Sequence, residues 1–143
     1  MFTETLREAL SIAAEEIDAA SHNGVTNTGF MDMSKFARAM FVGNVGTLGA
    51  SGTLDCSLYE SDYANGAAPN NLVAGTAITQ ITAANKTWTT EVNATQLTRR
   101  YLGCYTNNLV AASVYSVIPV GAEPRDHPCN SNDVASVTQR LVL

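Results

Sequence analysis

The fold class is decided by residues 37–61, which read ARAMFVGNVGTLGASGTLDCSLYES. In the second half of this stretch, every second residue from Leu54 to Leu58 is apolar, which is the period of a strand with one face in a core and the other in water. In the first half, Phe41 and Val45 share a face and apolar residues also occupy the other face. The intervening loop holds three glycines, which accept the backbone angles of tight turns. The pattern predicts a β-hairpin at the centre of an antiparallel sheet.

The composition indicates one domain with an unusually uncharged surface. The chain has 143 residues, of which 45% are hydrophobic and 15% are charged. This length is enough for one core and short for two. The charged fraction is well below the roughly 25% typical of soluble domains. Uncharged polar groups cost less to desolvate than charges do, so such a surface suits a protein that packs against neighbours.

The charge balance argues against several partners. The net charge is −5, the pI is about 4.8, and the eight Lys and Arg residues form no basic run. Direct binding to nucleic acid needs a cationic surface and is therefore not expected. Membrane binding is not expected either, because anionic lipid surfaces attract basic segments and no apolar run approaches the roughly 20 residues of a spanning helix. The N-terminus lacks the basic and apolar blocks of a signal peptide, so we expect the protein to be made and used in a cytosol.

No cofactor, metal site or catalytic site is predicted. Asp55, Glu60 and Asp62 lie close together in sequence but lack the ligand spacing and glycine of a calcium loop. The two histidines are far apart and neither has a nucleophile nearby, so we expect that the protein is not an enzyme. Cys56 and Cys104 lie in strand-like runs and are predicted to be buried core residues rather than a disulfide.

The two ends of the chain are predicted to be arms. Phe2, Leu6 and Leu10 recur at helical spacing, which predicts a short helix-like arm that orders on contact with a neighbour or with its own domain. The other end is apolar and favours β-structure, so it is expected to add a strand to its own domain or to a neighbour. The residues expected to bind a partner are Phe2, Leu6, Leu10, Val137, Leu141, Val142 and Leu143.

Between the arms, short strand-like runs alternate with turns. Seven or eight short strands predict an all-β fold, an antiparallel β-sandwich of the jelly-roll type. The expected organisation is an N-terminal arm over residues 1–28, a sandwich over 29–121 and an extended C-terminal arm over 122–143. Besides the central hairpin, strands are expected over residues 76–82, 87–93, 101–105 and 110–120, with the last ending at a sheet edge because Pro119 lacks an amide donor.

Two motifs in the chain resemble small structural proteins of tailed bacteriophages and prophages. Residues 31–46 read MDMSKFARAMFVGNVG, in which a D-M-x-x-F turn leads into an apolar strand. Residues 52–62 read GTLDCSLYESD and match a G-T-x-D-x-x-L-x-E-S strand. Residues 77–82, AITQIT, and 100–102, RYL, are also similar. The resemblance covers roughly residues 31–128 and is a pattern of strands and turns rather than a catalytic signature.

The resemblance implies a virion component, because several such proteins are capsid decoration, or cement, proteins. It implies a location on the capsid exterior, the major capsid protein as partner and a homo-oligomer, with a trimer favoured. A neck or tail component is the second interpretation. The third is a carbohydrate-binding sandwich that uses Tyr59, Tyr63 and Asn65, which are expected in a loop, because exposed aromatic rings stack on sugars.

Overall fold

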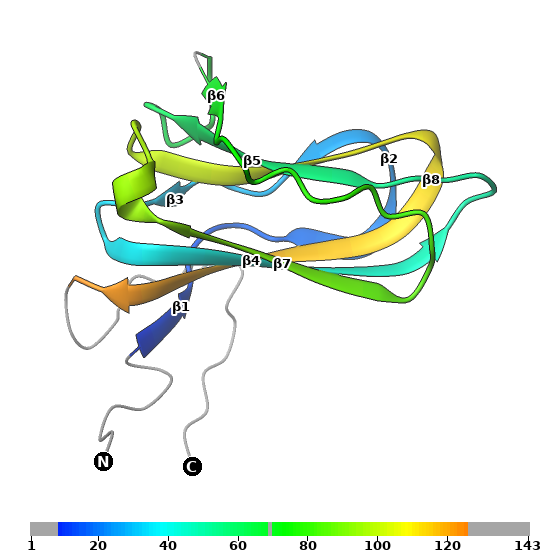
Figure 1. Ribbon diagram of the computed structural model, residues 1–143, viewed down its shortest axis with the longest axis horizontal. Coiled ribbons are helices and arrows are strands. Elements are labelled where there is room, and N and C mark those ends of the chain that lie inside the picture. The colour runs from blue at the N-terminus through cyan, green and yellow to red at the C-terminus, as the bar shows by residue number, and fades with distance from the viewer. Residues whose placement is uncertain (1–8, 69, 126–143) are drawn as a thin grey trace, which may run out of the picture.

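The computed structural model describes residues 9–68 and 70–125, which form antiparallel strands stacked in two layers (Figure 1). This confirms the predicted all-β sandwich. The described strands are β1 (Leu10–Ile12), β2 (Ile17–Asn27), β3 (Met31–Asp32), β4 (Phe36–Leu48), β5 (Asp55–Ser61), β6 (Asn70–Leu72), β7 (Lys86–Asn93) and β8 (Tyr101–Pro124), with one 3-10 helix, η1 (Ala94–Gln96).

The two layers share their longest strand. The first half of β8 pairs with β5 on one side and with β3 and the end of β2 on the other, and β6 extends this layer beyond β5. The second half of β8 pairs with β4 on one side and with β1 and the start of β2 on the other, and β7 extends this layer beyond β4. β8 and β2 therefore cross together from one layer to the other, and they close one side of the sandwich (Figure 1).

A local irregularity lets β8 turn the corner between the layers. The β2 partners of β8 are Gly24 opposite Asn108 and His22 opposite Ser113, so residues 109–112 stand opposite Asn23 alone. Extra residues on one strand of a pair bend that strand and increase its twist. The fully buried Asn108 donates from Nδ2 to the His22 carbonyl oxygen at 2.6 Å, which fixes β2 to the bend.

A buried hydrogen bond joins the two halves of β8 across the bend. The Tyr115 hydroxyl lies 2.8 Å from Thr106 Oγ1, and both residues are at most 1% exposed. Thr106 gives its own hydroxyl hydrogen to the Thr26 carbonyl oxygen, so Tyr115 is the donor to Thr106. Thr106 lies in the half of β8 that pairs with β5, and Tyr115 lies in the half that pairs with β4. The contact between them therefore fixes the spacing between the two layers.

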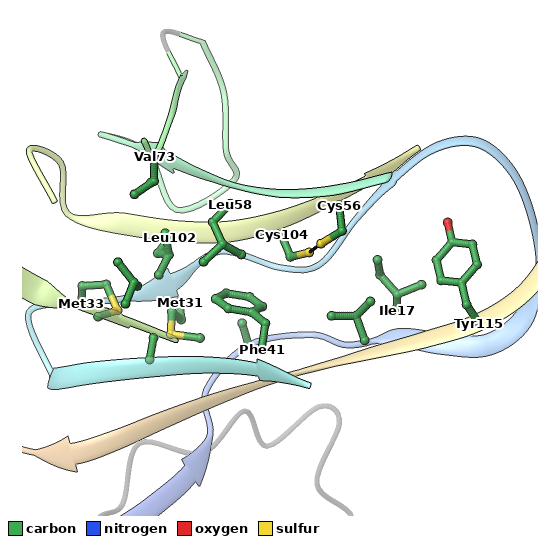
Figure 2. Close-up of a cluster of buried hydrophobic side chains, with 14 of the residues drawn as sticks. Ile17, Met31, Met33, Phe41, Cys56, Leu58, Val73, Leu102, Cys104 and Tyr115 are labelled. Atoms are coloured by element: carbon green, nitrogen blue, oxygen red, sulfur yellow. Dashed lines mark hydrogen bonds between the residues drawn. The ribbon is translucent and has the colours of Figure 1, made fainter. Parts of the chain in front are cut away.

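The core fills the space between the layers (Figure 2). Leu58 and Leu102 point into it from one layer, and Phe41 and Val45 from the other; all four are fully buried. The predicted alternation in residues 54–58 is confirmed, since Leu54, Cys56 and Leu58 are buried and the residues between them are partly exposed. Further core residues are Ile17, Met31, Met33, Val73, Val92 and Val117.

The predicted central hairpin is wrong. β4 pairs with β7 and β8, and β5 pairs with β6 and β8, so the two strands lie in different layers. The glycine-containing segment between them, residues 49–54, crosses from one layer to the other. Both strands read as strands in the sequence, but the strand that separates them in the sheet order, β8, lies more than 40 residues further along the chain and cannot be inferred from the local pattern.

The predicted N-terminal arm is also wrong over its described part. Residues 10–12 are strand β1, paired with Ala122–Val120, and β2 pairs along most of its length with β8, so the sandwich includes residues assigned to the 1–28 arm. Tertiary pairing with β8 overrides the helical spacing of the apolar residues. At the other end, Ala122–Pro124 still belong to β8, so the sheet runs past the predicted boundary at 121.

Two other strand predictions need correction. Residues 76–82 form no strand. Ile81 forms a bridge with Leu54, just before β5, and β5 itself is contacted by the Ile78 amide and by the side chains of Thr76 and Gln80. The two strands predicted over 101–105 and 110–120 are one continuous strand, with a bend in place of the predicted turn.

Pro119 does not end the last strand, because β8 continues to Pro124. The Pro119 carbonyl oxygen accepts the Ala13 amide at 3.2 Å, on the side where the ladder is interrupted between β1 and β2. A residue in an antiparallel strand directs its carbonyl and its amide position to the same side. The missing donor of Pro119 therefore faces this interruption and costs no ladder bond.

We predict that Tyr115→Phe destabilises the fold by about 1 kcal/mol, because it removes the hydroxyl donor to Thr106 and leaves the ring in place. Urea unfolding at pH 7 measures the loss. Tyr63→Phe is the matched control, since Tyr63 is 54% exposed and its substitution should leave the free energy of unfolding unchanged. Equal stability of the wild type and Tyr115→Phe would contradict the role assigned to this bond.

Candidate functional site

Of the predicted partner-binding residues, only Leu10 is described. It is half-buried in β1 opposite Ala122, so it belongs to the sheet and not to an arm. Phe2, Leu6, Val137, Leu141, Val142 and Leu143 lie outside the described residues. The start of β1 and the end of β8 are neighbours in the sheet, so the last described residues at the two ends of the chain lie at the same corner of the sandwich.

The first motif folds into a turn that is fixed by a carboxylate. Asp32 ends β3, and its Oδ1 accepts from the Ser34 amide at 3.0 Å and the Ser34 hydroxyl at 2.7 Å. Arg100 binds the same carboxylate with two atoms, Nε to Oδ1 at 2.8 Å and Nη2 to Oδ2 at 2.6 Å. These hydrogen bonds and the positive charge hold the pKa of Asp32 well below its ordinary value. The turn before β4 is thereby attached to the start of β8.

The second motif ends in a buried carboxylate with a similar role. Glu60, in β5, is 6% exposed and accepts from the Thr98 and Arg99 amides at 2.7 and 3.1 Å and also from the Thr98 hydroxyl. Its neighbour Asp62 pairs with the Arg99 guanidinium at 2.5 Å. Both motifs therefore hold the segment 98–100 against the sheet, and their acidic residues have structural partners.

Cys56 and Cys104 meet in the core between β5 and β8, where their sulfur atoms lie 2.9 Å apart (Figure 2). Both are free thiols and are at most 2% exposed, which confirms that they are core residues. The hydrogen bond with Cys56, together with burial, raises the pKa of the Cys104 thiol well above its ordinary value. A thiol that stays protonated is a poor nucleophile, so this pair packs the core.

The outer face of the β5–β8 layer carries a row of three aromatic rings. The Tyr59 and Tyr105 rings lie with centroids 4.7 Å apart, and Phe30 meets Tyr105 edge-on at 6.1 Å. Phe30 packs onto two glycines, since a Cβ at Gly66 or Gly103 would come within 3.0 Å of its ring. The sequence predicted Tyr59 in a loop, whereas it lies on strand β5.

A groove of about 220 Å³ runs over this face, and we call it the tyrosine groove. The groove is formed by β2, β5 and β8. Its lining residues lie side by side because they occupy paired positions on these neighbouring strands. The exposed side chain of Val25 flanks it. Its outward-facing lining residues are Val25, Asp55, Ser57, Tyr59, Tyr105 and Asn107.

Two polar residues of the tyrosine groove, Asp55 and Asn107, differ in their hydrogen bonding. Gln80 donates from Nε2 to both carboxylate oxygens of Asp55, at 3.0 and 3.1 Å, which fixes the orientation of the carboxylate. Asn107 Oδ1 has no hydrogen-bond partner among the described residues. Of the other two residues predicted for sugar binding, Tyr63 is exposed and Asn65 accepts from the Ala67 amide, but neither lines this groove.

A second depression, of about 410 Å³, lies at the open side of the sandwich. It is formed by residues 78–83 on one layer and 86–88 on the other. The Trp88 indole reaches inward over Gly43, where a Cβ would lie 2.1–2.4 Å from indole atoms. Trp88 packs against the core while remaining partly exposed. This depression is therefore the rim of the core.

Within residues 9–68 and 70–125, no group of three or more His, Cys, Asp or Glu side chains is placed to hold a metal ion. Nor does this part of the chain contain a helix that is long and apolar enough to cross a membrane.

The sequence matches no protein-family model and no curated protein sequence. The fold, however, is similar to solved structures. The crystal structure of the PBSX exported protein XepA matches with a TM-score of 0.55 at 14% identity, over 93% of this chain and 44% of XepA. A structure of the infectious bursal disease virus Gx strain matches with a TM-score of 0.36 at 13% identity, over 82% of this chain and 32% of the viral chain.

This chain thus spans less than half of the length of either protein that it matches. At such identities the XepA match shows a shared fold and nothing about activity. It supports the sandwich assignment independently of the strand pattern in the sequence.

We predict that Asp32→Asn destabilises the protein by about 1–2 kcal/mol at pH 7, because an amide cannot replace the charged acceptor of Arg100. The pKa of Asp32 is lowered on folding, so its contribution is fully present above the ordinary pKa of about 4 and is lost as the pH falls below it. Urea unfolding at pH 7 and pH 3 should therefore show a difference between wild type and variant that shrinks in acid.

The control for this series is Glu123→Gln. Glu123 forms an ion pair with Arg38 in which both side chains are about half exposed, so its loss should change the stability by less than about 0.5 kcal/mol at either pH. A deficit for Asp32→Asn that is as large at pH 3 as at pH 7 would contradict the role of its charge.

Proposed function

We propose that this chain is a structural protein of a tailed-bacteriophage virion and that it decorates the outer surface of the capsid, where it stabilises the junctions between capsomers. The observation that carries the proposal is the place of the phage-like motifs in the fold. Asp32, Glu60 and Arg100 belong to these motifs, and they make the charged contacts that tie β3, β5 and β8 together. The residues that carry the resemblance therefore make contacts on which the fold of this chain depends.

The surface chemistry supports an interaction role over a catalytic one. The motif carboxylates are engaged by backbone amides, by arginines or, for Asp55, by the Gln80 side chain, and the cysteine pair is buried. Exposed hydrophobic side chains lie on several elements of the sandwich, namely Val25, Tyr63, Leu72 and Val110. With only 15% charged residues in the chain, burying this surface against a partner desolvates few charges.

The affinity for a capsid shell would come from the large number of copies that bind to it. A standard protein interface buries about 1,600 Å² in total, and many copies joined across capsomer junctions gain through multivalency. The proposed partner is the major capsid protein, and a trimer would match a threefold junction. The last described residues at the two ends of the chain lie at one corner of the sandwich, which suits attachment there through Phe2 and Leu6 at one end and Val137, Leu141, Val142 and Leu143 at the other.

The fold match to the PBSX exported protein XepA is compatible with this proposal and also with a neck or tail component. The two placements differ in stoichiometry. A decoration protein follows the symmetry of the shell, and a neck or tail protein follows the low-order symmetry of a ring.

The test is the copy number of this protein in purified particles, measured by quantitative mass spectrometry against the major capsid protein. We expect on the order of hundreds of copies in fixed ratio to the shell protein, as closed shell symmetry requires. Surface biotinylation of intact particles should label them, which places them outside the shell. About a dozen copies would contradict decoration and favour the neck or tail, and absence from the particle would contradict a virion role.

A further inference from the structure

We propose that the tyrosine groove is a carbohydrate-binding site that holds one neutral pyranose ring of a larger glycan. This function is additional to the capsid role, and it rests on other residues. Three features of the groove support this function: a fixed aromatic floor, polar groups that match hydroxyls, and a size and charge that disfavour other ligands.

The floor of the groove is a pre-organised aromatic surface. Tyr59 and Tyr105 lie on adjacent strands with their rings in contact, and Phe30 also packs edge-on against Tyr105. Asn70 Nδ2 donates to the Tyr105 hydroxyl at 3.3 Å, which adds a further restraint. The face of an aromatic ring is electron-rich and attracts the slightly positive C–H groups that cover one face of a pyranose. Because the rings are already fixed, little conformational entropy is lost on binding.

The polar groups of the groove match the hydroxyls of a sugar. The Asp55 carboxylate offers two acceptors, and its orientation is set by Gln80 before any ligand arrives. A carboxylate that accepts hydroxyl hydrogens makes stronger bonds than a neutral acceptor does. Asn107 stands opposite Asp55 in the β5–β8 ladder, and its Oδ1 is a buried acceptor that has no partner among the described residues. Ser57, opposite Tyr105, adds a hydroxyl that can donate or accept.

The size and charge of the groove limit the ligand class. At about 220 Å³ it is smaller than the roughly 300–1,000 Å³ of pockets for drug-sized ligands, so it holds one ring while the rest of a glycan stays in solvent. The described residues that line it include no Lys or Arg, and Asp55 is their one formal charge. Phosphates and acidic sugars are therefore disfavoured, and a neutral hydroxyl-rich ring remains the best match.

The probes for the test are three methyl glycosides, of glucose, galactose and N-acetylglucosamine, titrated into the ¹⁵N-labelled full chain and followed by amide shifts. A pyranose has about a dozen non-hydrogen atoms, so at ordinary ligand efficiency its Kd should be on the order of millimolar. We expect at least one glycoside to move amides of Asp55–Tyr59 and Tyr105–Asn107 in a saturable manner. Inorganic phosphate should move none of them.

Matched variants test whether the sugar binds in the groove or elsewhere on the surface. Asp55→Asn and Tyr59→Leu should each weaken binding by about tenfold or more, since each removes a main contact. Asp62→Asn and Tyr63→Leu are the same substitutions at exposed sites outside the groove and should leave the Kd unchanged. Thermal unfolding of every variant checks that the sandwich remains folded.

The proposal is overturned if none of the glycosides gives saturable shifts at concentrations about tenfold above the expected Kd. It is equally overturned if Asp55→Asn and Tyr59→Leu bind as well as the wild type. Shifts of the groove amides that depend on protein concentration without sugar would assign the groove to a second copy of the chain, which also contradicts it. None of these results bears on the copy number in the virion, so the two proposals fail independently.

Discussion

The rest of the structure depends on the bend of β8, where the hydrogen bond from the Tyr115 hydroxyl to Thr106 joins the two halves of the strand. β8 is the central strand of both layers, and it pairs with five other strands in all. The angle at which it turns therefore sets the distance between the layers and with it the volume of the core. Asn108 fixes β2 to the same bend, so the two strands turn together. In this sandwich, the continuous backbone of β8 and β2 closes one side. The opposite side is open and holds the depression beside Trp88.

The proposed functions occupy parts of the molecule that this framework leaves available. The motif residues Asp32, Glu60 and Arg100 serve the framework, since their side chains hold the turn before β4 and the segment 98–100 in place. The last described residues at the two ends of the chain lie at one corner, beside β1 and the end of β8. The tyrosine groove lies on the outer face of the other layer, over β2, β5 and β8. Attachment at that corner and glycan binding in the groove would use different surfaces.

The sequence predicted the local features of the fold and missed those that depend on distant partners. The alternation in residues 54–58 correctly identified β5, because a strand with one buried face has a period of two whatever it pairs with. The hairpin was wrong because β5 pairs with β8, which no local pattern reveals. The helical spacing of Leu10 was misleading for the same reason.

For the tyrosine groove, the period of two in β5 places Asp55 and Tyr59 on one face of the strand. The sequence could not place Tyr105 beside them, since it reaches them only through the β5–β8 register. Residues 101–105 alternate between the inner and outer faces of the sheet, and this alternation places Tyr105 on the outer face. Its position next to Tyr59 could be inferred only once the partner strand of β8 was known.

The most direct measurement of the central claim is native-state hydrogen exchange of the hydrogen-bonded amides of β8 on both sides of its bend. If β8 and the Tyr115–Thr106 contact make the two layers one cooperative unit, amides in residues 102–106 and 114–118 should open with the same free energy, equal to that of global unfolding. A clearly lower opening free energy for one of the two halves would show that the layers unfold separately and would contradict the account.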